Sequence, residues 1–404
     1  MERVDVLVVG GGSAGLSTSH ELTGLGIEHV VLERGKVGQA WRDRWDSFCL
    51  VTPNWSVRLP GGGYAGDDPE GFIPRDEIVA HLERYAAGFS APVREGVAVQ
   101  TIERARDGFV ARTSLGDIQA SRVVLCSGAF QRPSRPTGSE ALPPGLLRLD
   151  LRDFRNEADL PPGRILVVGS GQSGCQLAEE LREAGREVAL SCGRASWGPR
   201  RFGGRDLIWW LEATGFLDQT VASLASPSAR VIATPVATGH GGGHDLNPRI
   251  LRAMGVTLVG RWLGVSGHEV RFAADLGDSV AWGDARYLEL REQVHRVASD
   301  LGLPRPDLPD PEPFDGAAPE TIALAGFGAV IFAGGFRPDF RSWLPFGEAF
   351  DELGFPIQVD GRSTVIDGLF FVGTQFLRNR KSSTLLGVGE DAAIVARTIA
   401  GTIS

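Results

Sequence analysis

The sequence predicts an α/β protein built from two Rossmann-like dinucleotide-binding domains, with the second domain inserted into the first. A glycine-rich strand–turn–helix pattern opens the chain, and the same pattern returns at residues 165–192. Two copies of one nucleotide-binding pattern predict two bound dinucleotides. The length of 404 residues is sufficient for two or three domains with substantial hydrophobic cores.

The first copy of the pattern begins with an apolar strand at 6–9, which leads into Gly10-x-Gly12-x-x-Gly15. Gly10 permits a tight turn, Gly12 lets the backbone approach a pyrophosphate, and Gly15 lets the following helix pack closely on the strand. The start of that helix offers N–H groups and a partial positive charge to phosphates. A second apolar strand ends in Glu33, whose carboxylate can accept both hydroxyl protons of a ribose.

The position of this first unit at the start of the chain favours FAD as its dinucleotide. A glycine-rich turn at 35–42 suits a loop that wraps the pyrophosphate, and the buried strand at 122–126 leads to a glycine. The last helix, opened by Gly387, is expected to direct its positive end at the pyrimidine edge of the flavin. The residues expected to hold FAD are Gly10, Gly12, Ser13, Ala14, Gly15, Glu33, Arg34, Gly38, Gln39, Trp41, Arg42, Ser127, Gly128, Gly373, Leu386 and Gly387.

The second copy differs from the first at the end of its second strand, which carries no acid and reads SCGR at 191–194. A carboxylate would repel the 2′-phosphate of NADPH, whereas an arginine can pair with it bidentately. This favours NADPH, with Arg194 as the best phosphate partner; the alternative is that the arginines here lie in a solvated loop. The residues expected to hold NADPH are Gly169, Gly171, Gln172, Ser173, Gly174, Arg194, Arg201, Gly334 and Gly335.

Further elements follow from hydrophobic periodicity. The pattern predicts a helix at 76–87 capped by Asp76, hairpin strands within 97–115, a helix within 202–224 and an irregular excursion at 304–319. Buried strands are predicted at 328–333 and 369–372.

The composition excludes several classes of function. The net charge of −9 gives no basic surface for nucleic acid, and no apolar run reaches 18 residues, so we expect neither nucleic-acid nor membrane partners. The N-terminus lacks the pattern of a signal peptide, which predicts a cytoplasmic protein. The four cysteines form no CxxC pair, which argues against a disulfide reductase. No metal site is predicted, because three glycines separate His240 from His244 and argue against a helix there.

Motifs along nearly the whole chain resemble the class B flavin-dependent monooxygenases, which include the flavin-containing and the plant indole-pyruvate monooxygenases. The stretch FRPDFRSWL at 336–344 resembles the TGYR…WL signature of this family closely, and VGTQFL at 372–377 resembles the family better than the GD motif of disulfide reductases. The other motifs that carry the resemblance are GGGSAG at 10–15, the turn Gly38-x-x-Trp41-Arg42, VVLCSG at 123–128 and GSGQSG at 169–174.

The resemblance implies an FAD domain formed by residues 1–158 and 325–404 and an inserted NADPH domain at 159–324. It implies that NADPH passes a hydride to FAD and that the reduced flavin takes up O₂ as a C4a-peroxyflavin. One oxygen atom then goes to a nitrogen, a sulfur or a carbonyl carbon of a small organic substrate. The active site would lie in the cleft at the carboxyl ends of the parallel strands. The resemblance does not identify the substrate, and it does not decide whether the protein forms a homodimer.

Two positions are catalytic candidates under this resemblance. Asn54 is expected to hydrogen-bond near the flavin C4a atom. Asp150 stands where the family fingerprint carries a histidine, and Phe154 stands where it carries a tyrosine. This departure leaves open an alternative, an NAD(P)H-linked flavin oxidase or dehydrogenase without productive oxygenation. A third possibility is a non-catalytic flavoprotein that senses redox state or binds a partner.

Overall fold

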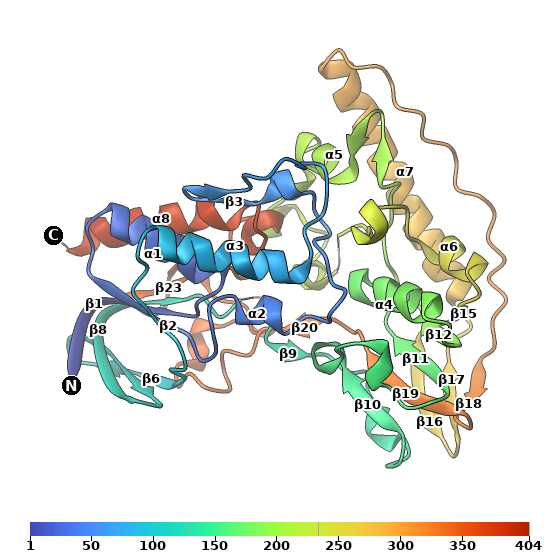
Figure 1. Ribbon diagram of the computed structural model, residues 1–404, viewed down its shortest axis with the longest axis horizontal. Helices are drawn as coiled ribbons and strands as arrows, with labels where there is room; N and C mark the ends of the chain where they lie inside the picture. Colours follow the sequence, from blue (N-terminus) through green and yellow to red (C-terminus); the bar gives the residue numbers. More distant parts are fainter. Residues whose placement is uncertain (129, 233, 404) are drawn as a thin grey trace.

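The computed structural model describes residues 1–128, 130–232 and 234–403. It contains two largely parallel sheets with helices packed around them, and these form two units that lie side by side (Figure 1). Both chain ends lie in the first unit. The predicted α/β class with two Rossmann-like units is therefore confirmed.

The sheet of the first unit has a parallel core in the order β23-β8-β1-β2-β5. Its strands β1 and β8 are almost completely buried toward their carboxyl ends, where the glycine motif and the loop after residue 125 begin. The core strands are β1 (Glu2–Val9), β2 (His29–Leu32), β5 (Val93–Arg94), β8 (Gly116–Leu125) and β23 (Leu369–Phe371). The antiparallel additions are β6 (Val99–Ala105), β7 (Gly108–Thr113), β21 (Gln358–Val359) and β22 (Arg362–Ser363). The helices of this unit are α1 (Ser13–Gly24), α2 (Gln39–Arg42), α3 (Arg75–Gly88) and α8 (Val388–Ile403), and a small hairpin joins β3 (Arg58–Leu59) to β4 (Gly62–Gly63).

The sheet of the second unit is entirely parallel, in the order β10-β19-β11-β12-β15. Its strands are β10 (Leu147–Asp150), β11 (Arg164–Val168), β12 (Val188–Ser191), β15 (Thr257–Val259) and β19 (Phe327–Phe332). A three-stranded antiparallel sheet comprises β16 (Trp262–Ser266), β17 (Glu269–Phe272) and β18 (Thr321–Ala323). The α-helices of this unit are α4 (Gln172–Glu183), α5 (Leu207–Ala213), α6 (Pro248–Ala253) and α7 (Leu276–Asp300).

The two crossings between the units run side by side. They form a short antiparallel ribbon of β9 (Arg132–Pro133) and β20 (Phe336–Arg337). Just beyond this ribbon, β10 and β19 pair with each other inside the second sheet. By sheet membership, the inserted unit thus includes residues 147–150 and 327–332, outside the limits of 159–324 expected from the sequence.

The segment 202–224 differs from its prediction as one helix. It begins with a hairpin of β13 (Arg201–Phe202) and β14 (Arg205–Asp206), because Gly203 and Gly204 adopt positive φ angles of 56° and 72°. The Asp206 carboxylate then accepts the Ile208 N–H at 2.8 Å and caps α5, which ends before Gly215.

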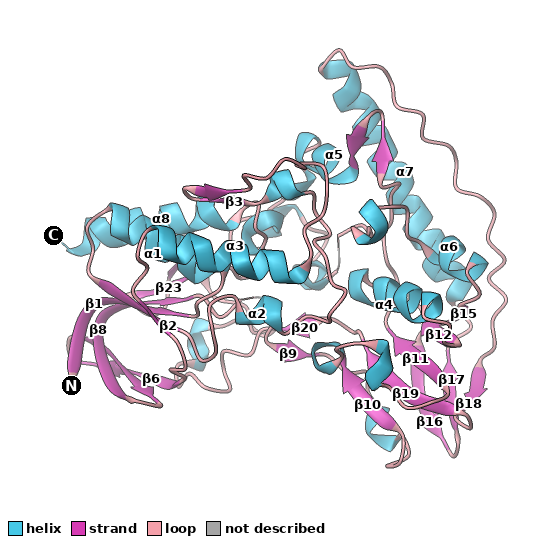
Figure 2. Cartoon of the chain, in the orientation of Figure 1, coloured by secondary structure: helices cyan, strands magenta, loops and turns pink. Residues whose placement is uncertain are grey.

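Two further segments can be compared with their predictions. Helix α3 buries the predicted face of Ile78, Val79, Leu82 and Tyr85, but its cap is Pro74, and Asp76 instead forms an ion pair with Arg75. The excursion between α7 and β18 contains no helix or strand, as predicted (Figure 2). No helix in the described part of the chain is long and apolar enough to cross a membrane. The short 3-10 helices are η1 (Asn54–Ser56), η2 (Ser139–Ala141), η3 (Leu151–Asp153), η4 (Glu157–Asp159), η5 (Phe216–Asp218), η6 (Val221–Ser223), η7 (Pro227–Val231), η8 (His240–Gly242), η9 (Gly347–Ala349) and η10 (Arg380–Ser383).

Candidate functional site

The two glycine motifs have the same backbone geometry. Gly10 and Gly169 adopt φ angles of 111° and 115°, which side-chain-bearing residues rarely adopt. A Cβ at Gly10 would lie 2.5 Å from the carbonyl oxygen of Cys126, and one at Gly169 would lie 2.6 Å from that of Ala333. Each turn therefore passes directly against the strand beside it, at the carboxyl edge of its own sheet.

The third glycine of each motif lies where the helix packs on this turn. A Cβ at Gly15 would lie 1.8 Å from the Gly10 carbonyl oxygen, and one at Gly174 would lie 1.8 Å from the Gly169 carbonyl oxygen. No other residue fits at such separations. The close packing expected from the sequence is present in both units.

The middle glycine of the first motif faces open space. A Cβ at Gly12 would meet no atom within 4 Å, and α1 begins at this point without a side-chain cap. Helix α4 also begins without one. The first N–H groups of a helix have no intrahelical partner, so both helix starts offer donors to a phosphate.

Glu33 is held at the end of β2, beside the first motif. Its side chain is buried, and the carboxylate accepts the N–H groups of Gly11 at 2.7 Å and Gly35 at 2.8 Å. Gly38, which precedes α2, donates its N–H to the Gly11 carbonyl at 3.1 Å. The predicted wrapping turn, with Arg34, Gln39, Trp41 and Arg42, is thereby tied to the motif.

Distant segments meet at the same edge of the first sheet. A Cβ at Gly373, just after β23, would lie 2.6 Å from the Cβ of Ala14 in α1. Ser127 and Gly128 follow the Cys126 carbonyl that Gly10 contacts. Leu386 and Gly387 immediately precede α8, whose packing partner is α1. The chain after β8 and after β23 thus lies against the start of α1 or the turn that precedes it, and α8 packs on the same helix.

Arg194 lies three residues after β12, beside the second motif. The Gly193 N–H donates to Ser170 Oγ at 3.0 Å, and Ser170 Oγ lies 3.2 Å from the Gly193 carbonyl, so the strand end is fixed to the motif. The side chain of Arg194 is exposed and has no hydrogen bond or ion pair within residues 1–128, 130–232 and 234–403. Arg261 lies next to Gly193, 3.8 Å from the position of a Cβ there, and the sequence did not reveal it because it follows a different strand.

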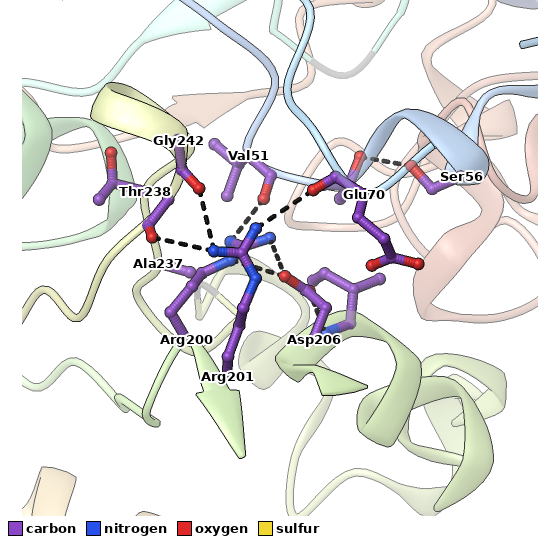
Figure 3. Close-up of polar contacts among 12 residues, drawn as sticks. Val51, Ser56, Glu70, Arg200, Arg201, Asp206, Ala237, Thr238 and Gly242 are labelled. Carbon is purple, nitrogen blue, oxygen red and sulfur yellow. Dashed lines mark hydrogen bonds and ion pairs between the residues drawn. The ribbon is translucent and has the colours of Figure 1, made fainter. Parts of the chain in front are cut away.

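Other residues assigned to the second motif have partners within the chain. The Gln172 side chain accepts the Ala237 N–H at 3.0 Å and donates to the Ala237 carbonyl. Arg201 donates to the backbone carbonyls of Glu70 and Gly242 at 3.2 and 3.0 Å (Figure 3). These contacts favour Arg194 over Arg201 as the phosphate partner. A Cβ at Gly334 would lie close to the Ser134 carbonyl, and Gly335 has a φ of 78°.

The two catalytic candidates lie in different surroundings. The Asn54 side chain is buried; its Nδ2 donates to the Asp68 carbonyl at 2.8 Å and its Oδ1 accepts the Ile73 N–H at 2.7 Å. Asp150 ends β10 and forms an ion pair with Arg135 at 2.6 Å. Phe154 is only 1% exposed and belongs to the hydrophobic core. Their roles near a flavin stay predictions.

The cysteines offer no reactive thiolate at neutral pH. All four are free, and burial raises the pKa of Cys49 to about 11 and the pKa values of Cys126 and Cys192 to about 12. In the described part of the chain, no three histidine, cysteine or acidic side chains come together as a metal site.

Asp391, in the first turn of α8, is expected to make the stability of the protein depend on pH. Burial raises its pKa to about 6, although Ser382 and Arg378 favour its ionised form. Because the folded state then holds this proton more tightly than the unfolded chain, stability falls as the pH rises from about 4 to about 6, by roughly 3 kcal/mol.

The Asp391→Asn variant removes this titration. Urea unfolding between pH 4 and 8 should show a smaller fall in the free energy of unfolding for the variant than for the natural protein. If the free energy of unfolding changed with pH in the same way for both proteins, the predicted contribution of Asp391 would be contradicted.

Comparisons with known proteins agree with this geometry. The chain matches the model of the pyridine nucleotide-disulphide oxidoreductase family over residues 7–203. A CzcO-like oxidoreductase of Geobacillus kaustophilus is 29% identical over 98% of both chains. Indole-3-pyruvate monooxygenase YUCCA8 of Oryza sativa subsp. indica is 25% identical over 98% of this chain and 90% of that protein. A flavin-containing monooxygenase from Stenotrophomonas maltophilia superposes with a TM-score of 0.71 over the full length of both chains, at 20% identity.

Proposed function

We propose that this chain, an oxidoreductase that resembles the class B flavin-dependent monooxygenases in sequence and fold, is an FAD-containing, NADPH-dependent monooxygenase. It would insert one oxygen atom from O₂ into a small organic substrate at a nitrogen, a sulfur or a carbonyl carbon. One observation carries the proposal. The chain holds two glycine motifs of equal geometry, and the strand beside one ends in an acid while the strand beside the other leads to an arginine.

The residues around the first motif fit FAD. The open backbone at Gly12 and the uncapped start of α1 suit a pyrophosphate, and Glu33 lies at the strand end where a ribose would bind. The side of this site formed by Gly373 and α8 would receive the flavin ring, whose reduced form the start of a helix stabilises. When bound, FAD would supply the hydride acceptor and the group that reacts with O₂.

The residues around the second motif fit NADPH. The start of α4 offers backbone donors to the pyrophosphate, and Arg194 offers a guanidinium without a carboxylate partner in the described part of the chain. Arg261 adds a second cation next to Gly193, although Asp275 pairs with it. The residue that would determine the choice of NADPH over NADH is therefore Arg194.

We further propose roles for Asn54 and Asp150. Each side-chain amide nitrogen carries two hydrogens, so Asn54 keeps one for the cofactor while it holds the loop 68–73 with its other groups. Asp150, at the carboxyl end of β10, is oriented by Arg135 at the edge of the second sheet where a nucleotide would bind. The side chains of the protein would position the two cofactors and exclude water from the site.

Anaerobic mixing of the purified protein with NADPH tests the proposal. We expect bound FAD to lose its visible absorbance, and subsequent mixing with isotopically labelled O₂ and a panel of amines, sulfides and ketones should place label in a product. Peroxide release without labelled product for every substrate would favour the oxidase or dehydrogenase, which Asp150 and Phe154 suggest as the alternative. Absence of bound flavin, or of reduction by NADPH, would overturn the assignment of the corresponding site.

A further inference from the structure

A buried cluster of side chains joins the inserted unit to the first unit. The Arg200 side chain is only 2% exposed, and its guanidinium pairs with Asp206 at 2.8 Å. Both residues belong to the β13–β14 hairpin region of the inserted unit. The same guanidinium donates from Nη1 to the carbonyl oxygen of Val51, in the first unit, at 2.7 Å (Figure 3).

Phe72 of the first unit lies against this cluster. Its ring centroid is 4.3 Å from the Arg200 guanidinium carbon and 5.6 Å from that of Arg201. A Cβ at Gly239 or Gly243 would lie 2.7 or 2.6 Å from the Phe72 side chain, so this segment of the inserted unit needs glycine to receive the ring. The ring is thus enclosed by two segments of the inserted unit.

The segment that receives Phe72 is attached along α4, the helix of the second nucleotide motif. Gln172, at the start of α4, exchanges two hydrogen bonds with Ala237. His244 lies 2.7 Å from the Glu179 carboxylate in the middle of the same helix. A continuous set of contacts therefore leads from the loop at Val51 and Phe72 to the second nucleotide motif.

The buried pair of Arg200 and Asp206 contributes more to the geometry of the contact between the units than to the stability of the protein. Burial lowers the pKa of Arg200 and raises the pKa of Asp206, so removal from water outweighs the mutual attraction in both side chains. Buried ion pairs of this kind seldom add net stability, but they favour one arrangement of the charged groups and their neighbours. Here that arrangement includes a carbonyl of the other unit.

We propose that Arg200 is a positioning residue which, together with Phe72, fixes the orientation of the two units and so the approach of NADPH to the flavin. The inference rests on the proposed function. It assigns Arg200 and Arg201 to contacts between the units, whereas Arg194 serves the cofactor phosphate.

Three variants test this role in the intact, flavin-loaded protein. Arg200→Lys retains the charge but cannot reproduce the planar guanidinium contacts, and Phe72→Ala removes the partner from the opposite side of the interface. Arg249→Lys is the matched control, because Arg249 pairs with Asp284 at 2.8 Å entirely within the inserted unit. Stopped-flow reduction by saturating NADPH should be about 10- to 100-fold slower for the first two variants, with unchanged NADPH affinity and flavin content. The flavin of Arg249→Lys should be reduced by NADPH at the same rate as that of the wild-type protein.

Hydrogen exchange of the flavin-free protein provides a second readout. The amides of Leu50 and Asn54 donate to the carbonyls of Ile73 and Gly71, and peptides that contain them should exchange faster in Arg200→Lys and Phe72→Ala than in Arg249→Lys. Natural reduction rates in both interface variants would overturn the inference. If NADPH does not reduce the natural protein, the proposed function fails, and unchanged exchange in the two variants would then overturn the positioning role separately.

Discussion

Replacement of Gly15 by alanine is expected to prevent the first unit from folding, whereas replacement of Gly12 by alanine is expected to leave the fold intact and weaken flavin binding. A Cβ at Gly15 would overlap the Gly10 carbonyl oxygen at 1.8 Å, and neither backbone can move away because Gly10 is itself packed against Cys126. Overpacking of a rigid core commonly costs about 1–3 kcal/mol or more. The overlap lies between a Cβ and a backbone atom, so no change of rotamer can relieve it. We therefore expect the destabilisation to reach or exceed the upper end of this range.

The Gly12→Ala variant meets no protein atom within 4 Å. Its methyl group would instead occupy the space that a pyrophosphate needs to approach the start of α1, so the affinity for FAD should fall on the order of 100-fold, or about 2.7 kcal/mol. Thermal unfolding and far-ultraviolet circular dichroism measure the fold, and flavin titration of the apoprotein measures the affinity.

Gly24, in the last turn of the same helix, provides the control. It lies in open space with an ordinary helical backbone, so Gly24→Ala should keep the flavin and stabilise the protein by about 0.5–1 kcal/mol. A Gly15→Ala protein with natural unfolding temperature and flavin content would contradict the packing argument. If Gly12→Ala bound flavin as tightly as the wild-type protein, the placement of the pyrophosphate at the start of α1 would be contradicted.

The features predicted correctly from the sequence are those fixed by neighbouring residues. The strand, turn and helix around Gly10, and again around Gly169, depend on steric requirements within about 30 residues. Helix α3 was recognisable from its apolar face, although its first residue was not, because Pro74 and Asp76 both suit a helix start. The hairpin before α5 was missed although its signals, Gly203-Gly204 and a capping Asp206, are present in the sequence.

The features that escaped prediction depend on contacts between distant segments. Nothing near Arg201 in the sequence indicates that its guanidinium binds carbonyls at Glu70 and Gly242. The amide of Asn54 likewise binds a loop whose path the local sequence does not determine. The pairing of β10 with β19 brings together residues 147–150 and 327–332, and this pairing shifts both limits of the inserted unit.

Substitution of Arg194 by alanine is expected to raise the KM for NADPH about 10- to 100-fold and to leave the KM for NADH nearly unchanged. Charge-assisted hydrogen bonds to phosphate contribute about 1.5–3 kcal/mol, and each 1.4 kcal/mol corresponds to a tenfold change in affinity. NADH lacks the 2′-phosphate that Arg194 would bind, so the loss of Arg194 removes no contact from bound NADH. Steady-state kinetics with both nucleotides, under the same conditions, measure the ratio directly.

Arg201→Ala separates phosphate recognition from a general effect of removing positive charge. Both substitutions remove one arginine from the stretch after β12, but Arg201 donates to backbone carbonyls whereas Arg194 extends into solvent. Arg201→Ala should therefore affect both nucleotides equally, through the contacts between the units. If Arg194→Ala also affected both equally, or if only Arg201→Ala changed the NADPH-to-NADH ratio, the phosphate would have to bind elsewhere. Arg261→Ala would then be the next variant to measure, because its side chain is the other cation beside Gly193.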